Sequence, residues 1–180
     1  AVNLGVKKSH GKYICLLNPD AQITSAPLSQ LVETSQKYQD HAIIAPRLLD
    51  KDGTPQPSCY RPQTIWNAIS EFWLGKKGSY SKYLPTKSGP VHAAVAACWL
   101  MPRTVWDELG GLDEKFFLYF EDIDMSDRAA KIGIPTIYDS LAKVVHEHGV
   151  SASTNPNTSK LFLTSAKIYH GSFKKTVVDL

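Results

Sequence analysis

The sequence predicts a single α/β domain, in which helices flank a mixed β-sheet. Two observations favour this class. Short apolar runs that end in turns alternate with stretches that carry apolar residues at helical spacing. The apolar runs are also continuous, as expected for strands that are covered on both faces. A length of 180 residues suffices for one sizeable core, and 43% hydrophobic with 21% charged residues is ordinary for a globular protein.

The first half of the chain predicts two strands and two helices. Gly11 ends the first helix, and Ser25 with Pro27 marks the start of the second. An Asp-Gly pair at residues 52–53 predicts a tight turn. In order, the predicted elements are a helix over residues 4–10, a strand over 12–17, a helix over 25–38, a strand over 41–45 that ends at Pro46, and a turn over 48–55.

Residues 57–89 differ in character from the rest of the chain. They hold three prolines, several glycines and serines, and six aromatic residues, so we expect a long loop with one helix over residues 64–74. Beyond this loop the predicted elements are a strand over 91–101, a helix over 102–109 stopped by two glycines, a helix over 119–132, short strands over 136–138 and 142–146, and an amphipathic, lysine-rich helix over 158–169.

Charge and composition exclude several classes of protein. The formal charge is +3, from 20 basic and 17 acidic residues, and this excess is too small for nucleic acid as the main partner. No apolar run approaches the roughly 20 residues that span a bilayer. The cysteines Cys15, Cys59 and Cys98 lack metal-type spacing and are expected as free thiols, so we expect a cytoplasmic protein.

One candidate carboxylate follows the predicted strand over residues 12–17. Asp20 would lie at the carboxyl end of that strand, where open α/β sheets bind ligands. There it could hold a hard divalent cation, which prefers oxygen ligands. Taken alone, the tripeptide Asn18-Pro19-Asp20 is also explained as a turn that Asp20 caps.

A second group of acidic residues begins the predicted helix over 119–132. Glu121, Asp122 and Asp124 follow an aromatic run. Acidic residues at a helix N-terminus complement the helix dipole, which is a sufficient structural reason for them. A carboxylate beside buried aromatics also has a raised proton affinity, and this property suits a general base.

A histidine ends the last predicted strand. His146 in that position is commonly structural. His146 and His148 are separated by one residue, which is compatible with zinc, but no third ligand of matching spacing lies nearby, so zinc is not expected.

Together these segments resemble glycosyltransferase family 2, in particular its bacterial rhamnosyltransferase-like branch. The resemblance covers residues 1 to about 155, with the family's order and spacing. The long acidic block is its most specific part. The matching motifs are Asn3-Leu4-Gly5, Leu17-Asn18-Pro19-Asp20, the acidic block from Gly110 through Arg128, and Val144 through Ser151.

The resemblance implies a GT-A (Rossmann-like) fold and transfer of a sugar from a nucleotide donor with inversion at the anomeric carbon. It implies Mg²⁺ or Mn²⁺ as cofactor, held by Asp20 and His146, with Asn18 beside Asp20 in the donor-binding motif. Asp122 would be the general base that deprotonates the acceptor hydroxyl. On the acceptor side, the implied residues are Glu121, Asp124, Trp99 and Arg128, with Arg128 paired to one of the acidic groups.

The resemblance also implies the partners. The donor would be a nucleotide sugar, with dTDP-rhamnose as first candidate and a UDP-hexose as second. The acceptor would be a saccharide or lipid-linked saccharide of bacterial surface polysaccharide synthesis. The aromatic residues of segment 60–83 either stack on acceptor sugar rings or pack under a loop, and the many breakers in the segment favour the first. The basic helical tail over residues 156–180 is either a solvated helix or a contact with an anionic membrane surface. We therefore expect a cytoplasmic protein that is free or peripheral at the inner face of the cell membrane.

Two departures from the family limit these expectations. Residues 93–96 read Ala-Ala-Val-Ala where the family usually has a Trp-x-x-Gly-like segment, so the acceptor preference does not follow from the resemblance. Family members also begin with two βα units that hold the nucleotide, on the order of 60 residues that this sequence does not contain. We therefore expect residues 1–155 to form an N-terminally incomplete GT-A domain with weak donor binding, and its uncovered sheet edge favours a homo-oligomer.

Two other functions compete with an active transferase. The first is an inactive relic that serves as a binding module. The missing N-terminal units favour it, whereas the joint presence of Asp20, Asp122 and His146 argues against decay. The second is a nucleotidyltransferase, which the sequence disfavours because its glycines form no phosphate-binding loop.

Overall fold

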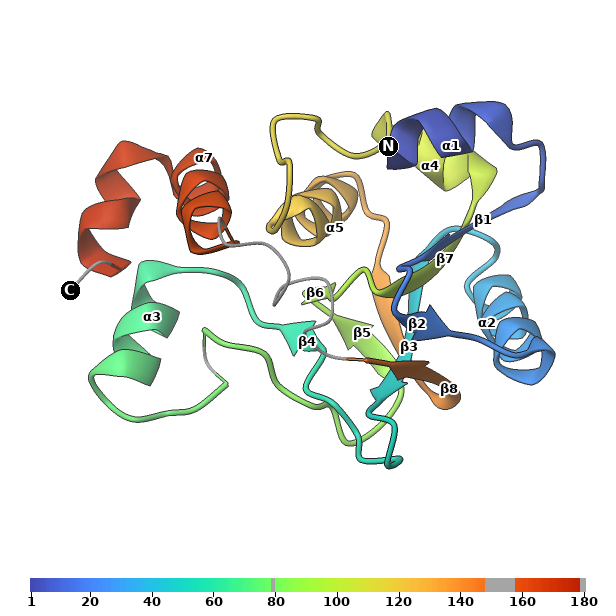
Figure 1. Ribbon diagram of the computed structural model, residues 1–180, viewed down its shortest axis with the longest axis horizontal. Helices are drawn as coiled ribbons and strands as arrows, with labels where there is room; N and C mark the ends of the chain where they lie inside the picture. Colours follow the sequence, from blue (N-terminus) through green and yellow to red (C-terminus); the bar gives the residue numbers. More distant parts are fainter. Residues whose placement is uncertain (79, 148–157, 179–180) are drawn as a thin grey trace.

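The computed structural model describes residues 1–78, 80–147 and 158–178 (Figure 1). Strands and helices alternate along most of the chain, as predicted. In order, the elements are α1 (Val2–Lys8), β1 (Tyr13–Leu17), β2 (Ala21–Gln22), α2 (Ser25–Lys37), β3 (Ile43–Leu49), β4 (Cys59–Tyr60), α3 (Ile65–Phe72), β5 (Gly89–Val91), β6 (Ala93–Ala94), β7 (Cys98–Pro102), α4 (Arg103–Leu109), α5 (Glu121–Lys131), β8 (Thr136–His146) and α7 (Thr158–Val178).

A mixed sheet forms the centre of the molecule, in the strand order β1-β7-β3-β8-β2 with β5 also paired to β8. β7 is antiparallel to both β1 and β3, and β8 is parallel to β3. Strands β1, β3 and β8 therefore run in the same direction, and their carboxyl ends meet at one edge. The short strands β4 and β6 form a separate pair.

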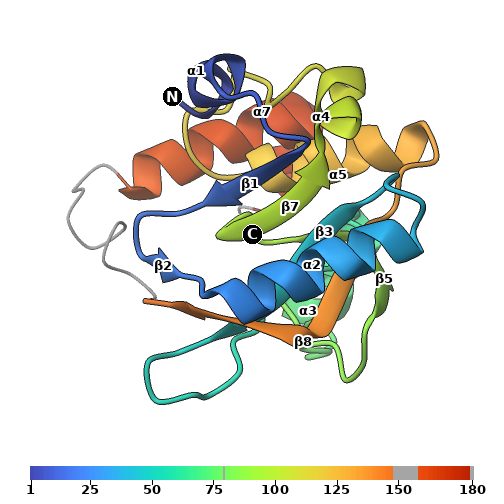
Figure 2. The ribbon, with the colours of Figure 1, turned by 90° about the vertical axis from the view of Figure 1, so that its right-hand side faces the viewer.

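Helices cover both faces of this sheet (Figure 2). On one face, Leu31 of α2 packs with Ile44 of β3 and Leu100 of β7. On the other, Met125 of α5 packs with Ile43 and Trp99, the chain neighbours of those two strand residues. Successive strand residues thus enter opposite cores, which explains why the strands are continuous apolar runs in the sequence.

The predicted strand over residues 91–101 is wrong as a single element. The structure divides it into β5, which pairs with β8, β6, which leaves the sheet to pair with β4, and β7, which lies between β1 and β3. A continuous apolar run indicates burial but not the partner that buries it. Here consecutive parts of one run pair with four different strands, β8, β4, β1 and β3.

The opposite error affects the last strands. The segments 136–138 and 142–146 were predicted as separate strands but belong to the single strand β8. Its pairing with β3 changes register between Pro46 and Arg47. Pro46 also fails to end β3, because a residue without an N–H group is tolerated where the hydrogen-bond ladder is interrupted.

Three simpler expectations can be checked on the described residues. Cys15, Cys59 and Cys98 are free thiols, as expected. None of the described helices is long and apolar enough to cross a bilayer. β1 and β2 stand at the two ends of the strand order in the described sheet.

The segment after α4 is fixed from two sides. The side chain of Asn3 accepts a hydrogen bond from the Leu112 N–H at 3.0 Å and donates one to the Leu112 carbonyl at 2.9 Å. Arg128 of α5 donates to the carbonyls of Leu109 at 2.6 Å and Gly111 at 2.9 Å. The Asn-x-Gly helix and the acidic block, far apart in sequence, are thereby held in one unit.

Gly111 and Gly110 provide a matched test of this packing. Both have positive φ, +79° and +71°, but a Cβ on Gly111 would meet Asn3 Oδ1 at 3.0 Å and Trp106 Cζ2 at 3.1 Å, whereas a Cβ on Gly110 would meet nothing within 4 Å. We expect Gly110→Ala to cost roughly 1–2 kcal/mol of unfolding free energy from backbone strain alone. Gly111→Ala should cost a further 1–3 kcal/mol or so from overpacking. Urea denaturation of both variants measures the difference, and equal costs would contradict the packing argument.

Candidate functional site

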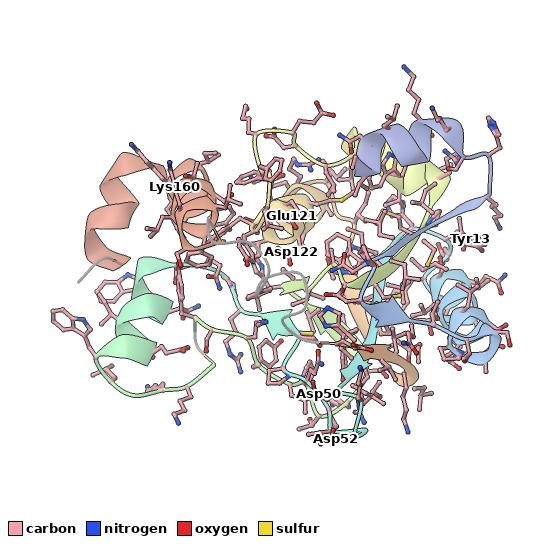
Figure 3. The ribbon with its side chains drawn as sticks, viewed as in Figure 1. Tyr13, Asp50, Asp52, Glu121, Asp122 and Lys160 are labelled. Carbon is pink, nitrogen blue, oxygen red and sulfur yellow. The ribbon has the colours of Figure 1, made fainter. Side chains whose placement is uncertain are left out.

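A cavity lies at the edge of the sheet where β1 and β8 end. It has a volume of about 610 Å³. Asn18, Asp20 and His146 line one part of it, and Glu121 and Asp122 at the start of α5 line another. Five residues predicted from three separate motifs therefore share one cavity. Figure 3 shows Glu121 and Asp122 near the centre of the molecule, between the sheet and α7.

Strand pairing brings Asp20 and His146 together. β2 follows Asp20 directly and pairs antiparallel with the end of β8, so that Ala21 stands opposite His146. The Glu147 N–H donates to the Asp20 carbonyl at 2.8 Å. As a result, Asp20 Oδ1 lies 3.4 Å from His146 Nε2.

Gln56 indicates which ring nitrogen of His146 carries the proton. Its amide nitrogen donates to Asp50 Oδ1 at 2.6 Å and to the His146 carbonyl at 2.7 Å, so its oxygen must face the ring. That oxygen lies 3.1 Å from His146 Nδ1, which must therefore carry a proton. In the neutral ring, Nε2 then presents its lone pair toward Asp20 and the cavity.

This arrangement fits a divalent metal ion. A histidine that binds a metal through one nitrogen characteristically donates its other N–H to an oxygen, as His146 does to Gln56. Carboxylate oxygen with imidazole nitrogen suits Mn²⁺ and, less well, Mg²⁺. Among the described residues no group of three His, Cys, Asp or Glu side chains could hold a metal, so a metal here would need ligands beyond Asp20 and His146.

The backbone before α5 is strained. Tyr119 and Phe120 have φ values of +69° and +66°, a region that residues other than glycine rarely adopt. Such conformations cost of order 1–3 kcal/mol each and are characteristic of functional sites. Here they turn the chain sharply enough to aim Glu121 and Asp122 into the cavity at the first turn of α5.

Burial makes Asp122 a weak acid. Its side chain is only 8% exposed. Desolvation, followed by the charge of neighbouring Glu121, raises its pKa to about 7, although the backbone N–H groups of Ile123 and Ala96 oppose the shift. Burial also raises the pKa of Glu121. A carboxyl group with a pKa near 7 is suited to accept and release protons at neutral pH.

Aromatic and basic side chains complete the wall. Tyr60 and Tyr80 come from the long loop, and Phe162 comes from α7. Lys82 also lines the cavity, where burial lowers its pKa and the Asp122 carboxylate acts in the opposite direction. Lys82 was missed in the sequence because a lysine in a loop carries no local signal of burial.

Helix α7 belongs to this site and packs against the acidic block. Phe162 and Tyr169 contact the ring of Phe120 at centroid distances of 5.5 and 5.2 Å. Tyr169 donates a hydrogen bond to the Asp127 carboxylate, and Ser165 donates to the Leu118 carbonyl at 2.7 Å. The helix thereby covers the strained turn that precedes Glu121.

Three predicted acceptor residues lie outside the cavity lining. The prediction of Trp99 as an acceptor residue is wrong. Its side chain is fully buried in the core beside the sheet and cannot reach an acceptor. Asp124 and Arg128 pair with each other at 2.8 Å. This confirms the expected pairing of Arg128 with an acidic group and places both residues in the support of the 109–111 segment.

The expectation for the aromatic residues holds in part, and the last motif is described only in part. Of the aromatics in segment 60–83, Tyr60 and Tyr80 line the cavity, whereas Trp66 and Trp73 are 78% and 71% exposed and do not line it. The motif from Val144 through Ser151 is described as far as residue 147, so its remaining residues, with His148, lie outside the described residues.

Curated proteins with similar sequences point to one activity. An N-acetylglucosaminyl-diphospho-decaprenol L-rhamnosyltransferase of Mycobacterium tuberculosis is 25% identical over 152 residues, 80% of this chain and 50% of that protein. The low-salt glycan biosynthesis hexosyltransferase Agl10 of Haloferax volcanii is 24% identical over 172 residues, 89% of this chain and 52% of that protein. The chain is related to the family 2 glycosyltransferases. It spans about half the length of these two relatives.

Solved structures support the fold. The crystal structure of GalNAc-T7 with UDP, GalNAc and Mn²⁺ matches with a TM-score of 0.58 and 14% identity, over 88% of this chain and 33% of that one. A197 from STIV matches with a TM-score of 0.51 and 14% identity, over 83% of this chain and 64% of that one. The predicted GT-A fold is thereby confirmed. No protein-family model matches the chain.

The raised pKa of Asp122 predicts a pH-dependent stability. The pKa lies above the ordinary value of 3.8, so the protonated carboxyl stabilises the fold at low pH, and this stabilisation is lost as pH rises through about 7. Asp122→Asn cannot ionise and should escape the loss. We expect the unfolding free energy of the variant, relative to the original chain, to increase between pH 5 and pH 8.

Urea denaturation at both pH values measures this effect. Asp113→Asn is the control. The hydrogen bond from the Lys115 N–H is the main reason why the pKa of Asp113 is lowered, so Asp113 is fully ionised throughout this range. The control should change stability by the same amount at pH 5 and pH 8. A parallel pH dependence of Asp122→Asn and the original chain would show that Asp122 ionises normally.

The tautomer of His146 gives a second test. Gln56→Met should leave Asp50, the His146 carbonyl and Nδ1 without their partner, at a cost of roughly 1–3 kcal/mol. Nitrogen NMR of the ring should report the Nδ1–H form in the original chain and a mixture in the variant. Gln63→Met is the control, because buried Gln63 bonds the carbonyls of Arg61 and Tyr80 instead. An Nε2–H ring in the original chain would refute the assignment.

Proposed function

We propose that the cavity is the active site of an inverting glycosyltransferase, which moves a sugar from a nucleotide donor to a saccharide or lipid-linked saccharide acceptor. One observation carries the proposal: Asp122, with a pKa near 7, shares a cavity with the Asp20–His146 pair. The two groups supply what such a transfer needs, a base for the acceptor and a polar site for the leaving diphosphate.

The proposed reaction is a direct displacement. The Asp122 carboxylate accepts the proton of an acceptor hydroxyl while that oxygen bonds to the anomeric carbon of the donor sugar. The bond between this carbon and the diphosphate oxygen breaks, and its electron pair leaves with the nucleoside diphosphate. Attack from the face opposite the leaving group inverts the anomeric carbon.

The other polar groups would bind and orient the reactants. Asp20 and His146 Nε2 would hold Mg²⁺ or Mn²⁺, which neutralises charge on the leaving diphosphate when bound. Glu121, at the same helix end, would accept a hydrogen bond from an acceptor hydroxyl. Tyr60 and Tyr80 offer aromatic faces on which sugar rings can stack, and Ala96 also lines the cavity.

The names of two relatives support the proposed donor and biological role. The relative from Mycobacterium tuberculosis is named as an L-rhamnosyltransferase that acts on a diphospho-decaprenol sugar, and the one from Haloferax volcanii as a hexosyltransferase. We therefore favour dTDP-rhamnose as donor, with a UDP-hexose next, in the synthesis of a bacterial surface polysaccharide at the cytoplasmic side of the membrane.

Asp122 provides the test of this proposal. In the natural gene product, supplied with dTDP-rhamnose or UDP-hexoses, Mn²⁺ and a prenyl-diphosphate sugar, we expect Asp122→Asn to lower kcat roughly 10²–10⁴-fold with little change in donor KM. The rate of the original enzyme should rise with pH through about 7. The control Asp113→Asn should keep full activity. An undiminished rate in Asp122→Asn would overturn the assigned base.

The alternative is a domain that binds saccharides without transferring them. It is favoured by the fact that, among the described residues, no set of three possible metal ligands comes together. Calorimetry on the natural gene product with nucleoside diphosphate and Mn²⁺ separates the two functions. The transferase requires metal-dependent binding that Asp20→Asn abolishes, whereas a binding module would take up saccharide without nucleotide or metal.

A further inference from the structure

The long loop presents an apolar and basic surface to solvent on the side away from the cavity. Trp66 and Trp73 are 78% and 71% exposed, and Leu74 is 66% exposed. Trp66 and Trp73 are seven residues apart on α3 and its C-cap, so they project from the same side of the helix. Single exposed apolar residues are ordinary, but three large ones along one short helix and its C-terminal turn are not.

Basic side chains stand directly beside these residues. Lys76 and Lys77 follow in an exposed turn, and Arg61 is bound to that turn through the Gly78 carbonyl at 3.2 Å. Residues 61–82 contain four basic residues against one acidic residue, Glu71. The Glu71 carboxylate accepts hydrogen bonds from the N–H groups of Tyr80 and Ser81 at 2.7 and 2.9 Å, so it is engaged within the loop.

We propose that this surface (Arg61, Trp66, Trp73, Leu74, Lys76 and Lys77), which we call the α3 tip, docks on an anionic phospholipid bilayer. Tryptophan favours the interface between headgroups and acyl chains, where its ring is apolar and its N–H remains hydrated. Lysine and arginine close to such a surface are attracted by anionic headgroups. The α3 tip combines both properties on one short helix and the segments that flank it.

Charge argues against a second copy of the chain as the occupant. A twofold contact through Trp66 and Trp73 would bring the basic residues of both copies together, and like charges repel. A bilayer with anionic lipids instead supplies the complementary sign. The position is also distinctive: α3 and α7 contact each other at the end of the molecule farthest from α2 (Figure 1).

The tip differs from the tail that the sequence suggested as a membrane contact. In α7, Tyr169 is bound to Asp127, and Phe162 packs on Phe120 with about half of its surface still exposed, so both aromatics are engaged with the protein, unlike Trp66 and Trp73. The α3 tip lies outside the cavity, but its loop continues into the cavity wall at Tyr80 and Lys82. Under the proposed function, docking would therefore place the cavity near lipid-linked acceptors.

Vesicle flotation with the full chain tests the proposal. We expect binding to vesicles of phosphatidylcholine with one quarter phosphatidylglycerol, weak binding to phosphatidylcholine alone, and release in 0.5 M NaCl. Lys76→Gln with Lys77→Gln should lower the partition coefficient about 25-fold, or five-fold for each lysine. Trp66→Ser with Trp73→Ser should abolish binding.

Matched controls come from β8, which lies away from α3 in the structure (Figure 1). Leu141 is 70% exposed, close to Trp73, and Lys143 is also exposed. Leu141→Ser and Lys143→Gln should leave vesicle binding unchanged. Tryptophan emission gives an independent readout: Trp99 and Trp106 are already buried, so a blue shift on adding vesicles would report Trp66 and Trp73.

Each other outcome overturns the proposal. No binding to anionic vesicles, or binding that survives the tryptophan variants, would exclude the α3 tip as the membrane contact. A concentration-dependent dimer that the tryptophan variants abolish would assign the surface to a second copy. None of these readouts requires sugar transfer, so docking and the proposed function can fail separately.

Discussion

The buried carboxylate of Asp139 holds the bend in β8 on which the site depends. One of its oxygens accepts hydrogen bonds from Thr34 and Gln30 of α2 at 2.6 and 3.1 Å, and the other accepts the Leu141 N–H at 2.9 Å. Residues 140–142 have no partners in β3, yet the pairing resumes after them. A buried carboxylate is tolerated because donors surround it. Because of this bend, β8 pairs with β3 on both sides of the interruption, and its last residue, His146, still pairs with β2.

Two opposing electrostatic effects act on the acidic pair at the start of α5, and their balance makes Asp122 useful. The helix dipole favours negative charge there, by about 0.3–1 kcal/mol for an exposed group. Burial against aromatic side chains and the repulsion between Glu121 and Asp122 act in the other direction and are larger, since the pKa of Asp122 reaches about 7. In the same cavity, His146 is held by the Gln56 amide, so its neutral ring presents a lone pair. One cavity thus offers a proton acceptor and a nitrogen ligand suited to a metal ion.

The sequence predicted the parts of this site that local pattern encodes. Asp20 and His146 follow apolar runs, and Asp122 starts a helix after an aromatic run, so their places at strand and helix ends were predictable. Gln56 was not, because it lies in a loop and acts through atoms 90 residues away. Trp99 was misassigned for a related reason: in a strand covered on both faces, the pattern alone does not distinguish a core side chain from one that reaches a ligand. Long-range pairing, which also divided the run over residues 91–101 into three strands with different partners, is what local sequence leaves open.

In the long loop after β4, hydrogen bonds join the exposed helix α3 to the segment that lines the cavity. Glu71 on α3 accepts the N–H groups of Tyr80 and Ser81, so the helix is bonded directly to the segment that forms the cavity wall. On the other side, Tyr80 pairs with His170 of α7 at 2.7 Å, and α7 in turn packs on Phe120 beside the acidic pair. These hydrogen bonds and ring contacts therefore form one continuous chain of described residues from α3, through the aromatic wall of the cavity and α7, to the strained turn before Glu121.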